Sequence, residues 1–481
     1  MRLRRSGGVR WCGLRRAGVL TIGALLLCGG LFGAGRDGAG LVSTASAKDD
    51  GPPAKEPGPK ATGKVYTWKA TNGLAYDFYL PKTYEAEKGI TLTLILHGSN
   101  GWKGWGFGMH TPGEFRPDDF VVSPEGTTAN GQGGFNSLQS GKDLKRFHEF
   151  LVELKKLVKV NATFIYGLSQ GSFFAHFYAG QHGEEVQGIV AHGSNLWMGS
   201  GLKKKNHGQA IAVMHGRGDP VVGYSNGVDA MRGYVDLKYP TLKFRTVELN
   251  LHWAPWGHQA QQLAWCEALT TEDPARLIHS FEWMENVKDS DGWFLDPVAA
   301  YQVARRVTEM DGIDPKAQGR AKKMMAAIDG VAAKQVAAIQ ASYDKTKKKI
   351  TKSATWPLQA HYFVRDWMGV PAADAWAKKW KKTIEKQLDT AQKARVDYWG
   401  ALKKGKHGKA FSAGMDVIEK GVLSHWSVDP EMLANLAKWR DDAKGSGVSA
   451  AAVKRYDRVV KPFLDCREKG KKAYAKLNKK L

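Results

Sequence analysis

One stretch of this chain, residues 162–178, constrains the fold more than any other. It reads A-T-F-I-Y-G-L-S-Q-G-S-F-F-A-H-F-Y. A short apolar run leads into Gly167-Leu168-Ser169-Gln170-Gly171, and residues with helical spacing follow. This pattern predicts a strand, a tight turn that carries a serine, and then a helix. Glycine suits both flanking positions, because the serine backbone in such a turn is strained and its neighbours pass close to other chain.

The segments around this stretch alternate between strand-like and helix-like patterns. Apolar runs interleaved with helices are typical of a parallel sheet that helices cover on both faces. A helix is predicted over Gly141–Leu157, from its amphipathic spacing. The expected strands are Val65–Trp68, Ala75–Leu80, Ile90–Leu96, Phe120–Ser123, Val186–Ala191, Ile211–Met214 and Phe244–Leu251.

Candidate partners for Ser169 follow later strands in the order acid, then histidine. Asp219 comes just after the strand ending at Met214, and His252 and His258 come after the last strand. Serine is a weak nucleophile unless a histidine takes its proton, and a carboxylate holds that histidine in the right tautomer. His258 is favoured over His252 as the base, because its reach from the strand end is longer and a glycine precedes it. Asp219 could instead merely begin a turn before Pro220.

Four motifs together carry a resemblance to a known fold family. They are L-H-G-S-N-G at Leu96–Gly101, G-L-S-Q-G at Gly167–Gly171, H-G-R-G-D-P-V-V at His215–Val222 and W-G-H at Trp256–His258. Residues 64–288 resemble an α/β-hydrolase of the polyhydroxyalkanoate-depolymerase, feruloyl-esterase and phospholipase/carboxylesterase group. The resemblance implies Ser169 as nucleophile, Asp219 as acid and His258 as base.

The same resemblance predicts the surroundings of the reacting serine. The oxyanion hole would use the backbone N–H of Gln170 and that of Ser99, with Asn100 as the substitute for Ser99 if the loop is shifted by one residue. Tryptophans fall in loops at the predicted catalytic edge, where they could bind a flat aromatic, sugar-linked or polyester substrate or simply cover the loop cores. The substrate candidates are Trp102, Trp197 and Trp256, with Trp105 and Trp253 nearby. The histidines show no metal-ligand spacing, so no metal or other cofactor is expected.

The first 47 residues have the pattern of a secretory signal peptide. A basic head precedes an apolar core at residues 17–32, and Ala45-Ser46-Ala47 forms a small-x-small cleavage site. A membrane anchor is the alternative, although the core is short for one. Residues 48–63 are rich in proline and glycine and predict a disordered linker. The protein would then be secreted or periplasmic, and its remaining cysteines, Cys266 and Cys466, could form a disulfide.

The charge is unevenly distributed, which predicts a second domain. Residues 48–290 carry 25 basic and 25 acidic side chains, whereas residues 291–481 carry 39 and 21. This break places a boundary near Asp289–Asp296, and a lysine-rich helical domain of six or seven helices over 289–481. Asp296-Pro297, Asp314-Pro315 and Asp429-Pro430 each suit a helix start, and an apolar stripe runs from Trp376 to Trp399.

The function expected from these patterns is hydrolysis of a carboxylic ester through an acyl-enzyme on Ser169. A serine peptidase or thioesterase is the alternative within the same mechanism. A different class remains open: a cell-surface binding protein whose hydrolase part is a degenerate scaffold. The lysine-rich domain could hold an anionic lipid or polymer, or be only a solvated surface. No nucleic-acid-binding motif is present.

Overall fold

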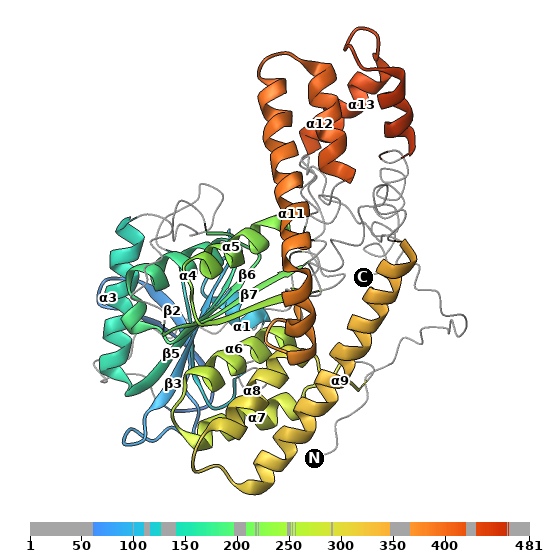
Figure 1. Cartoon of the computed structure of the whole chain (residues 1–481). Helices are drawn as coiled ribbons and strands as arrows, with labels where there is room; N and C mark the ends of the chain where they lie inside the picture. Colours follow the sequence, from blue (N-terminus) through green and yellow to red (C-terminus); the bar gives the residue numbers. More distant parts are fainter. Residues whose placement is uncertain are drawn as a thin grey trace, which may run out of the picture.

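The computed structural model shows a sheet flanked by helices, followed by a long helical extension (Figure 1). The predicted signal segment 1–47 and most of the linker, residues 48–60, lie outside the described residues, as do Asp429 and Cys466. The structure describes residues 61–99, 101–109, 116–126, 141–196, 208–216, 219, 221–247, 252, 254, 256–289, 292–346, 366–419, 430–458 and 460.

Eight strands form one sheet in the order β1-β2-β4-β3-β5-β6-β7-β8. Strand β2 pairs antiparallel with both β1 and β4, and all other neighbours pair in parallel. This topology confirms the predicted α/β-hydrolase fold. The strands are β1 (Val65–Lys69), β2 (Ala75–Tyr79), β3 (Ile90–Leu96), β4 (Phe120–Pro124), β5 (Val160–Leu168), β6 (Gly188–His192), β7 (Ala210–Gly216) and β8 (Thr241–Val247).

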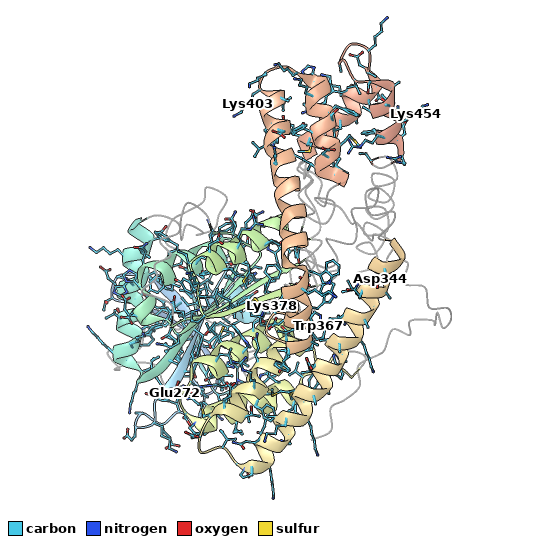
Figure 2. All side chains as sticks on the ribbon, in the orientation of Figure 1. Glu272, Asp344, Trp367, Lys378, Lys403 and Lys454 are labelled. Atoms are coloured by element: carbon cyan, nitrogen blue, oxygen red, sulfur yellow. The ribbon has the colours of Figure 1, made fainter. Side chains whose placement is uncertain are left out.

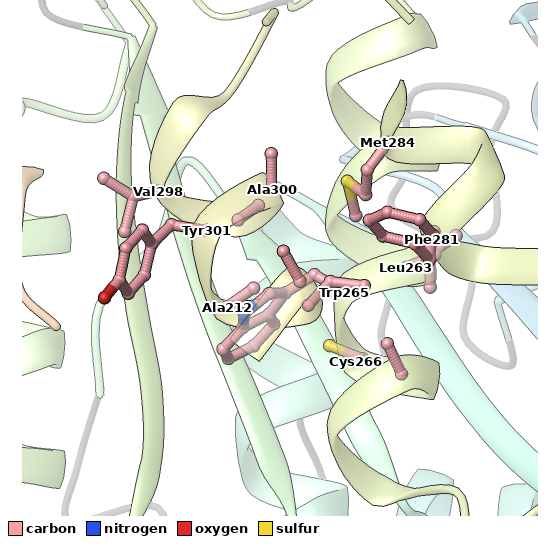
Figure 3. Packing of buried hydrophobic residues seen from close by; sticks show 14 of the residues in the cluster. Ala212, Leu263, Trp265, Cys266, Phe281, Met284, Val298, Ala300 and Tyr301 are labelled. Atoms are coloured by element: carbon pink, nitrogen blue, oxygen red, sulfur yellow. The ribbon is translucent and has the colours of Figure 1, made fainter. Parts of the chain in front are cut away.

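Helices cover both faces of this sheet, because both faces of its central strands are apolar. Side chains of α3 (Gly141–Leu157), α4 (Gln170–Gln181) and α5 (Ser225–Asp236) share a buried cluster with one face. Those of α6 (Trp256–Thr270), α7 (Pro274–Asn286) and α8 (Pro297–Glu309) share a cluster with the other. Figure 3 shows part of that second cluster, with Trp265 beside Ala212 of β7, Phe281 beside Met284, and Tyr301 beside Val298. The short elements α1 (Gly104–Met109) and η1 (Gly183–Glu185) complete the α/β part.

The sequence located the elements well but missed the start of the last strand. The strand over Ile90–Leu96 and the helix over Gly141–Leu157 have the predicted bounds. Strand β8 runs over Thr241–Val247 rather than Phe244–Leu251, and residues 248–251 lie outside the described part. Lys243 hid the early start, since its buried ammonium is paired with Asp296 and so does not mark solvent.

The apolar core continues through the boundary expected near Asp289–Asp296. Buried residues of α8, the first half of α9 (Pro315–Thr346) and the start of α11 (Pro371–Leu402) belong to the same cluster as the sheet. Polar contacts join the same elements: the Trp265 indole N–H donates to Gln302 at 2.6 Å, and Gln302 donates to the Met368 carbonyl at 3.1 Å. The break in charge therefore does not coincide with a break in packing.

A separate small core, here called the distal core, lies at the far end of α11 (Figure 1). It joins buried residues between Ala394 and Val460, including Tyr398 of α11, Phe411 of α12 (His407–Glu419) and Leu436 of α13 (Pro430–Asp441). The predicted apolar stripe thus serves two cores. Trp376 packs with the sheet and Tyr398 with the distal core, and the side chains of 381–390 between them lie outside the described set.

Two smaller expectations concern caps and cysteines. The Asp296 side chain accepts from the Ala299 N–H at the start of α8, and Asp314 accepts from the Lys316 N–H at the start of α9, as the Asp-Pro pairs predicted. Cys266 is buried and free. Within the described ranges, none of the helices is long and apolar enough to cross a membrane.

Candidate active site

Ser169 lies on the sharp turn between β5 and α4. Its φ of 51° and ψ of −118° place a non-glycine residue in a strained backbone conformation, which sheet and helix on either side impose. A Cβ at Gly167 would come within 2.5 Å of the Gly171 carbonyl oxygen. A Cβ at Gly171 would come within 2.5 Å of the carbonyl oxygens of Leu96 and His97. Both glycines are therefore required by space, as the sequence predicted.

The loop after β3 passes directly beside Ser169. A Cβ built on Gly98 would lie 3.3 Å from the Ser169 Cβ. His97 holds this loop in place: its Nδ1–H donates to the Gly98 carbonyl at 2.8 Å, and its Nε2 accepts from the Gly126 N–H at 3.1 Å. Burial lowers the pKa of His97, consistent with a neutral ring that braces backbone. Ser99 follows as an exposed residue, and Asn100 lies outside the described part.

Asp219 follows β7 and is held from two sides. Its Oδ1 accepts from the backbone N–H groups of Val221 and Val222, each at 2.9 Å. Its Oδ2 accepts from His252 Nδ1 at 2.7 Å, and His215 Nε2 lies 3.4 Å from the same oxygen. Burial would raise the pKa of this carboxyl group, but the contacts with His215 and His252 outweigh burial and lower the pKa to about 2. Asp219 is therefore ionised and aimed at His252.

The prediction that Asp219 orients His258 requires a correction. His258 is the third residue of α6, and its buried Nδ1 has no hydrogen-bond partner among the described residues. Burial, reinforced by the nearby positive charge of Arg245, lowers the pKa of His258 to about 4. The physical reason for the difference is the short strand: β8 ends at Val247, so His252 already reaches Asp219, while His258 is carried into the helix.

The turn after β6 connects the serine and the Asp219–His252 pair. The Ser169 N–H donates to the His192 carbonyl at 2.9 Å. The next residue, Gly193, has a φ of 66° and lies against the pair: a Cβ there would be 3.3 Å from His252 Cε1 and 3.4 Å from Asp219 Oδ2. Ser169 contacts His192 and His252 lies against Gly193, so both lie beside the same pair of residues at the carboxyl edge of the sheet.

The predicted tryptophan cluster is only partly placed. Trp102 is 57% exposed and follows the loop that passes Ser169. Trp105 instead packs against the sheet–helix core. Trp256 begins α6, but its side chain lies outside the described part, as do Trp197 and Trp253 altogether. Trp102 is therefore the one predicted substrate contact whose side chain is described and exposed.

The remaining histidines near the site are buried within the protein. Burial lowers the pKa of His192 to about 3, and its Nδ1 lies 3.0 Å from the Tyr166 hydroxyl. His176 has a similarly lowered pKa and contacts the Tyr234 hydroxyl. Over the described ranges, no three histidine, cysteine or acidic side chains are gathered as metal ligands.

Sequence reasoning missed the contact between His215 and Asp219. A histidine in a His-Gly dipeptide at a strand end usually packs or bonds to backbone, so the pattern around His215 predicts no chemical role for it. The four-residue spacing across Gly216-Arg217-Gly218 was the available signal, because a glycine-rich turn can return the acid to the ring that precedes it.

Comparison with known proteins supports the resemblance over part of the chain. Residues 141–253 match the family model of phospholipase/carboxylesterase, which confirms the expected resemblance for that segment. No curated protein matches the chain.

Solved structures with a similar arrangement include several esterases. A ferulic acid esterase is 17% identical with a TM-score of 0.35, covering 42% of this chain and 94% of its own. A feruloyl esterase module from Clostridium thermocellum is 16% identical with a TM-score of 0.31, covering 43% and 89%. Est1E from Butyrivibrio proteoclasticus is 14% identical with a TM-score of 0.31, covering 43% and 96%.

Proposed function

We propose that this chain is a serine hydrolase that cleaves carboxylic esters, with Ser169 as nucleophile, His252 as general base and Asp219 as its orienting acid. The observation that carries the proposal is the 2.7 Å hydrogen bond between Asp219 and His252, at the same sheet edge as the strained Ser169. The match of residues 141–253 to phospholipase/carboxylesterases supports the choice of an ester.

Each step follows from the chemistry of these side chains. Because Nδ1 of His252 donates to Asp219, its Nε2 is free of a proton in the neutral ring and can accept that of the Ser169 hydroxyl. The serine oxygen then attacks the ester carbonyl, and His252 returns the proton to the leaving alcohol. Water, activated by the same histidine, hydrolyses the acyl-enzyme. Asp219 stays ionised throughout and stabilises the imidazolium.

The oxyanion that forms during attack needs donors at the turn. We assign this role to the backbone N–H of Gln170, which begins α4, and to that of Ser99 in the loop beside Ser169. The amino end of α4 also favours developing negative charge. Trp102 is the candidate wall for the acyl or alcohol group, since its exposed ring follows the same loop.

The decisive experiment compares the two candidate histidines. Ser169→Ala and His252→Gln should each lower the hydrolysis of nitrophenyl esters by about 10⁴-fold or more. His258→Gln is the matched control and should retain most activity, because His258 does not contact Asp219. A fluorophosphonate probe should label the intact protein and not Ser169→Ala. Equal labelling of both would defeat the proposal, and loss of activity in His258→Gln alone would return the base to that residue.

The class of leaving group is tested separately. A panel of acyl-chain lengths, aryl esters, thioesters and peptides should show faster turnover of oxygen esters than of thioesters or peptides. Faster turnover of thioesters or peptides would replace the esterase assignment with the alternative on the same mechanism. Absence of both labelling and turnover would favour the binding-protein alternative with a degenerate scaffold.

The basic helices suggest a place of action, which is a separate part of the proposal. Exposed lysines gather around the distal core, where Figure 2 labels Lys403 and Lys454, and Lys378 is exposed near the foot of α11. We propose that they hold the enzyme near an anionic lipid or polymer outside the cytoplasm, after removal of residues 1–47 as a signal. Binding to anionic vesicles should weaken as salt rises. Binding that salt does not change would contradict the anchoring role. A purified native protein that still begins at residue 1 would contradict export with signal removal.

A further inference from the structure

The loop that carries Asp219 contains a second histidine that the mechanism above does not use. His215 is the penultimate residue of β7 and is fully buried. Its Nε2 lies 2.7 Å from the Val222 carbonyl oxygen and 3.4 Å from Asp219 Oδ2. The same Oδ2 accepts the hydrogen bond from His252, so both rings meet at one oxygen.

The surroundings of His215 determine its protonation. Nε2 faces a carbonyl oxygen and a carboxylate oxygen, which can only accept, so Nε2 carries the proton. Nδ1 is buried with no hydrogen-bond partner in the described part of the chain. The ring sits against α5 at Gly227, where a Cβ would approach Nδ1 to 2.5 Å. Nε2 of His215 is thus a donor confined to one position.

We propose that His215 is a positioning residue for the ester hydrolysis: held between Val222 and Asp219, it keeps the Asp219 carboxylate aimed at His252. The inference rests on the proposed function and deepens it. The Val222 N–H donates to Asp219 Oδ1 while the Val222 carbonyl accepts from His215, so the ring closes the loop around the acid. Without it, Oδ2 loses its second neighbour and the loop loses its inner support.

His215 is itself supported from the side of the helical extension. The Tyr224 ring meets it edge-on, with ring centroids 5.8 Å apart. The Tyr224 hydroxyl lies 2.6 Å from Thr246 Oγ1, and Thr246 donates to Asp366 Oδ1 at 2.9 Å. Asp366 stands just before α11, so packed and hydrogen-bonded groups run without a gap from the foot of that helix to the catalytic acid.

Two substitutions of His215 test this role: one removes the N–H donor, and the other replaces it with an amide donor. His215→Leu should lower kcat/KM by about 10- to 100-fold, the scale on which loss of a second-layer partner lowers activity at metal sites. His215→Gln, whose amide can reach the same two oxygens, should recover most of that loss. Gly227→Ala should act in the same direction as His215→Leu, because it displaces the ring without altering its chemistry.

A pH profile separates positioning from a merely structural role. His215 shares the charge of Oδ2, so its loss leaves more of that charge to His252, which then holds its proton more tightly. The acid limb of the kcat/KM profile should therefore move to higher pH in His215→Leu. Among the described residues, the rings of His192, His258 and Tyr224 also lie near the pair, and they remain in place in every variant. Thr246→Val should show a smaller shift of the same sign.

His176→Leu is the matched control, since His176 is another fully buried histidine whose ring contacts the Tyr234 hydroxyl rather than Asp219. It should leave the acid limb unmoved. The proposal is overturned if His215→Leu loses activity only in proportion to its folded fraction, or if His176→Leu produces the same shift. Labelling of Ser169 by the fluorophosphonate in the wild type, absent in Ser169→Ala, keeps this outcome distinct from failure of the proposed function.

Discussion

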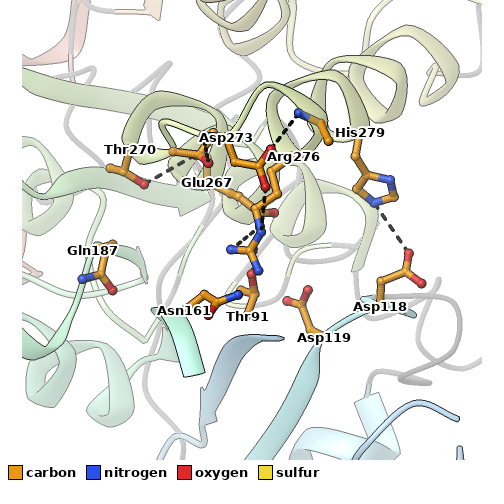
Figure 4. A network of polar contacts seen from close by, with 12 residues as sticks. Thr91, Asp118, Asp119, Asn161, Gln187, Glu267, Thr270, Asp273, Arg276 and His279 are labelled. Atoms are coloured by element: carbon orange, nitrogen blue, oxygen red, sulfur yellow. Dashed lines mark hydrogen bonds and ion pairs between the residues drawn. The ribbon is translucent and has the colours of Figure 1, made fainter. Parts of the chain in front are cut away.

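The two ends of the sheet both bury carboxylates, but they give them different partners. At the amino end, Arg116 donates to Asp119 at 2.7 Å and to Glu267 at 2.6 Å. Thr93 and Thr91 donate to the same two carboxylates. Figure 4 labels Thr91, Asp119 and Glu267 of this network, with Arg276 beside Glu267. At the carboxyl end, Asp219 has two histidines and two backbone N–H groups instead.

At equal burial, the two groups of carboxylates differ in the chemistry of their partners. A guanidinium keeps its charge at every physiological pH, so the amino-end network can only hold elements together. An imidazole can release and take up a proton near neutrality, so the carboxyl-end pair can do chemistry. Depth within the protein is the same at both ends and is not what distinguishes them.

The largest effect should follow from neutralising the carboxyl-end acid. Asp219→Asn should lower kcat by about 10⁴-fold, because the amide permits the wrong tautomer of His252. The urea midpoint should change little, since the amide keeps an acceptor for the Val221 and Val222 N–H groups. Steady-state kinetics with urea unfolding measures both. Retained activity would show that His252 does not depend on Asp219.

Breaking the amino-end network should have the opposite signature. Arg116→Met leaves Asp119 and Glu267 buried without their cation, which typically costs about 3–5 kcal/mol of unfolding free energy. Turnover per folded molecule should stay near that of the wild type, since no member of the network approaches Ser169. Active-site titration with the fluorophosphonate counts folded enzyme. A variant of normal stability but low turnover would contradict the separation of the two ends.

Acid should lower the free energy of unfolding, because histidines such as His192 and His258 have pKa values that burial lowers in the folded protein. The pKa is lowered by burial to about 3 in His192 and about 4 in His258, whereas unfolded histidine titrates near 6.5. The unfolded chain therefore takes up protons first, and stability should begin to fall as pH drops below about 6.5. Each such histidine contributes a slope of up to about 1.4 kcal/mol per pH unit.

His258→Gln tests this source directly. It should reduce the loss of stability between pH 6.5 and 4.5, measured as urea midpoints, relative to the wild type. An unchanged slope in His258→Gln would assign the acid sensitivity elsewhere.

The smallest effect should come from removing the distal core. A chain ending at Lys382 retains Trp376 and Trp380, which pack with the sheet, but loses the residues from Ala394 onward. Turnover of a small soluble ester should change by no more than about twofold, because distant sites without shared contacts behave independently. Salt-sensitive binding to anionic vesicles should fall instead. A large loss of turnover would show that the distal core supports the site.

Local patterns sufficed for the elements and for two of the three proposed catalytic residues. Gly167 and Gly171 flank Ser169 for steric reasons that hold wherever such a turn occurs, and Asp219 stands where a strand of this fold delivers an acid. The bounds predicted for periodic segments such as Ile90–Leu96 and Gly141–Leu157 were confirmed, because a strand or helix that is buried on one or both faces must be apolar there.

The choice of histidine and the extent of the core share one feature, which is that they depend on distances between segments. His252 and His258 are both plausible by spacing, and the end of β8 at Val247 gives Asp219 to His252. The domain boundary was inferred from lysines, which report only the solvent side of a helix. Burial in α8 and α9 follows their other face, and that face packs against the sheet.

The chain's own order of residues therefore established an α/β sheet, a strained serine and an acid beyond the seventh strand, since each depends on neighbours a few residues apart. The contacts of Asp219 with His252 and His215, and the continuation of the core into α11, arose on folding. Each of these depends on atoms that residues distant in sequence bring within a few ångströms, and no local pattern encodes that distance.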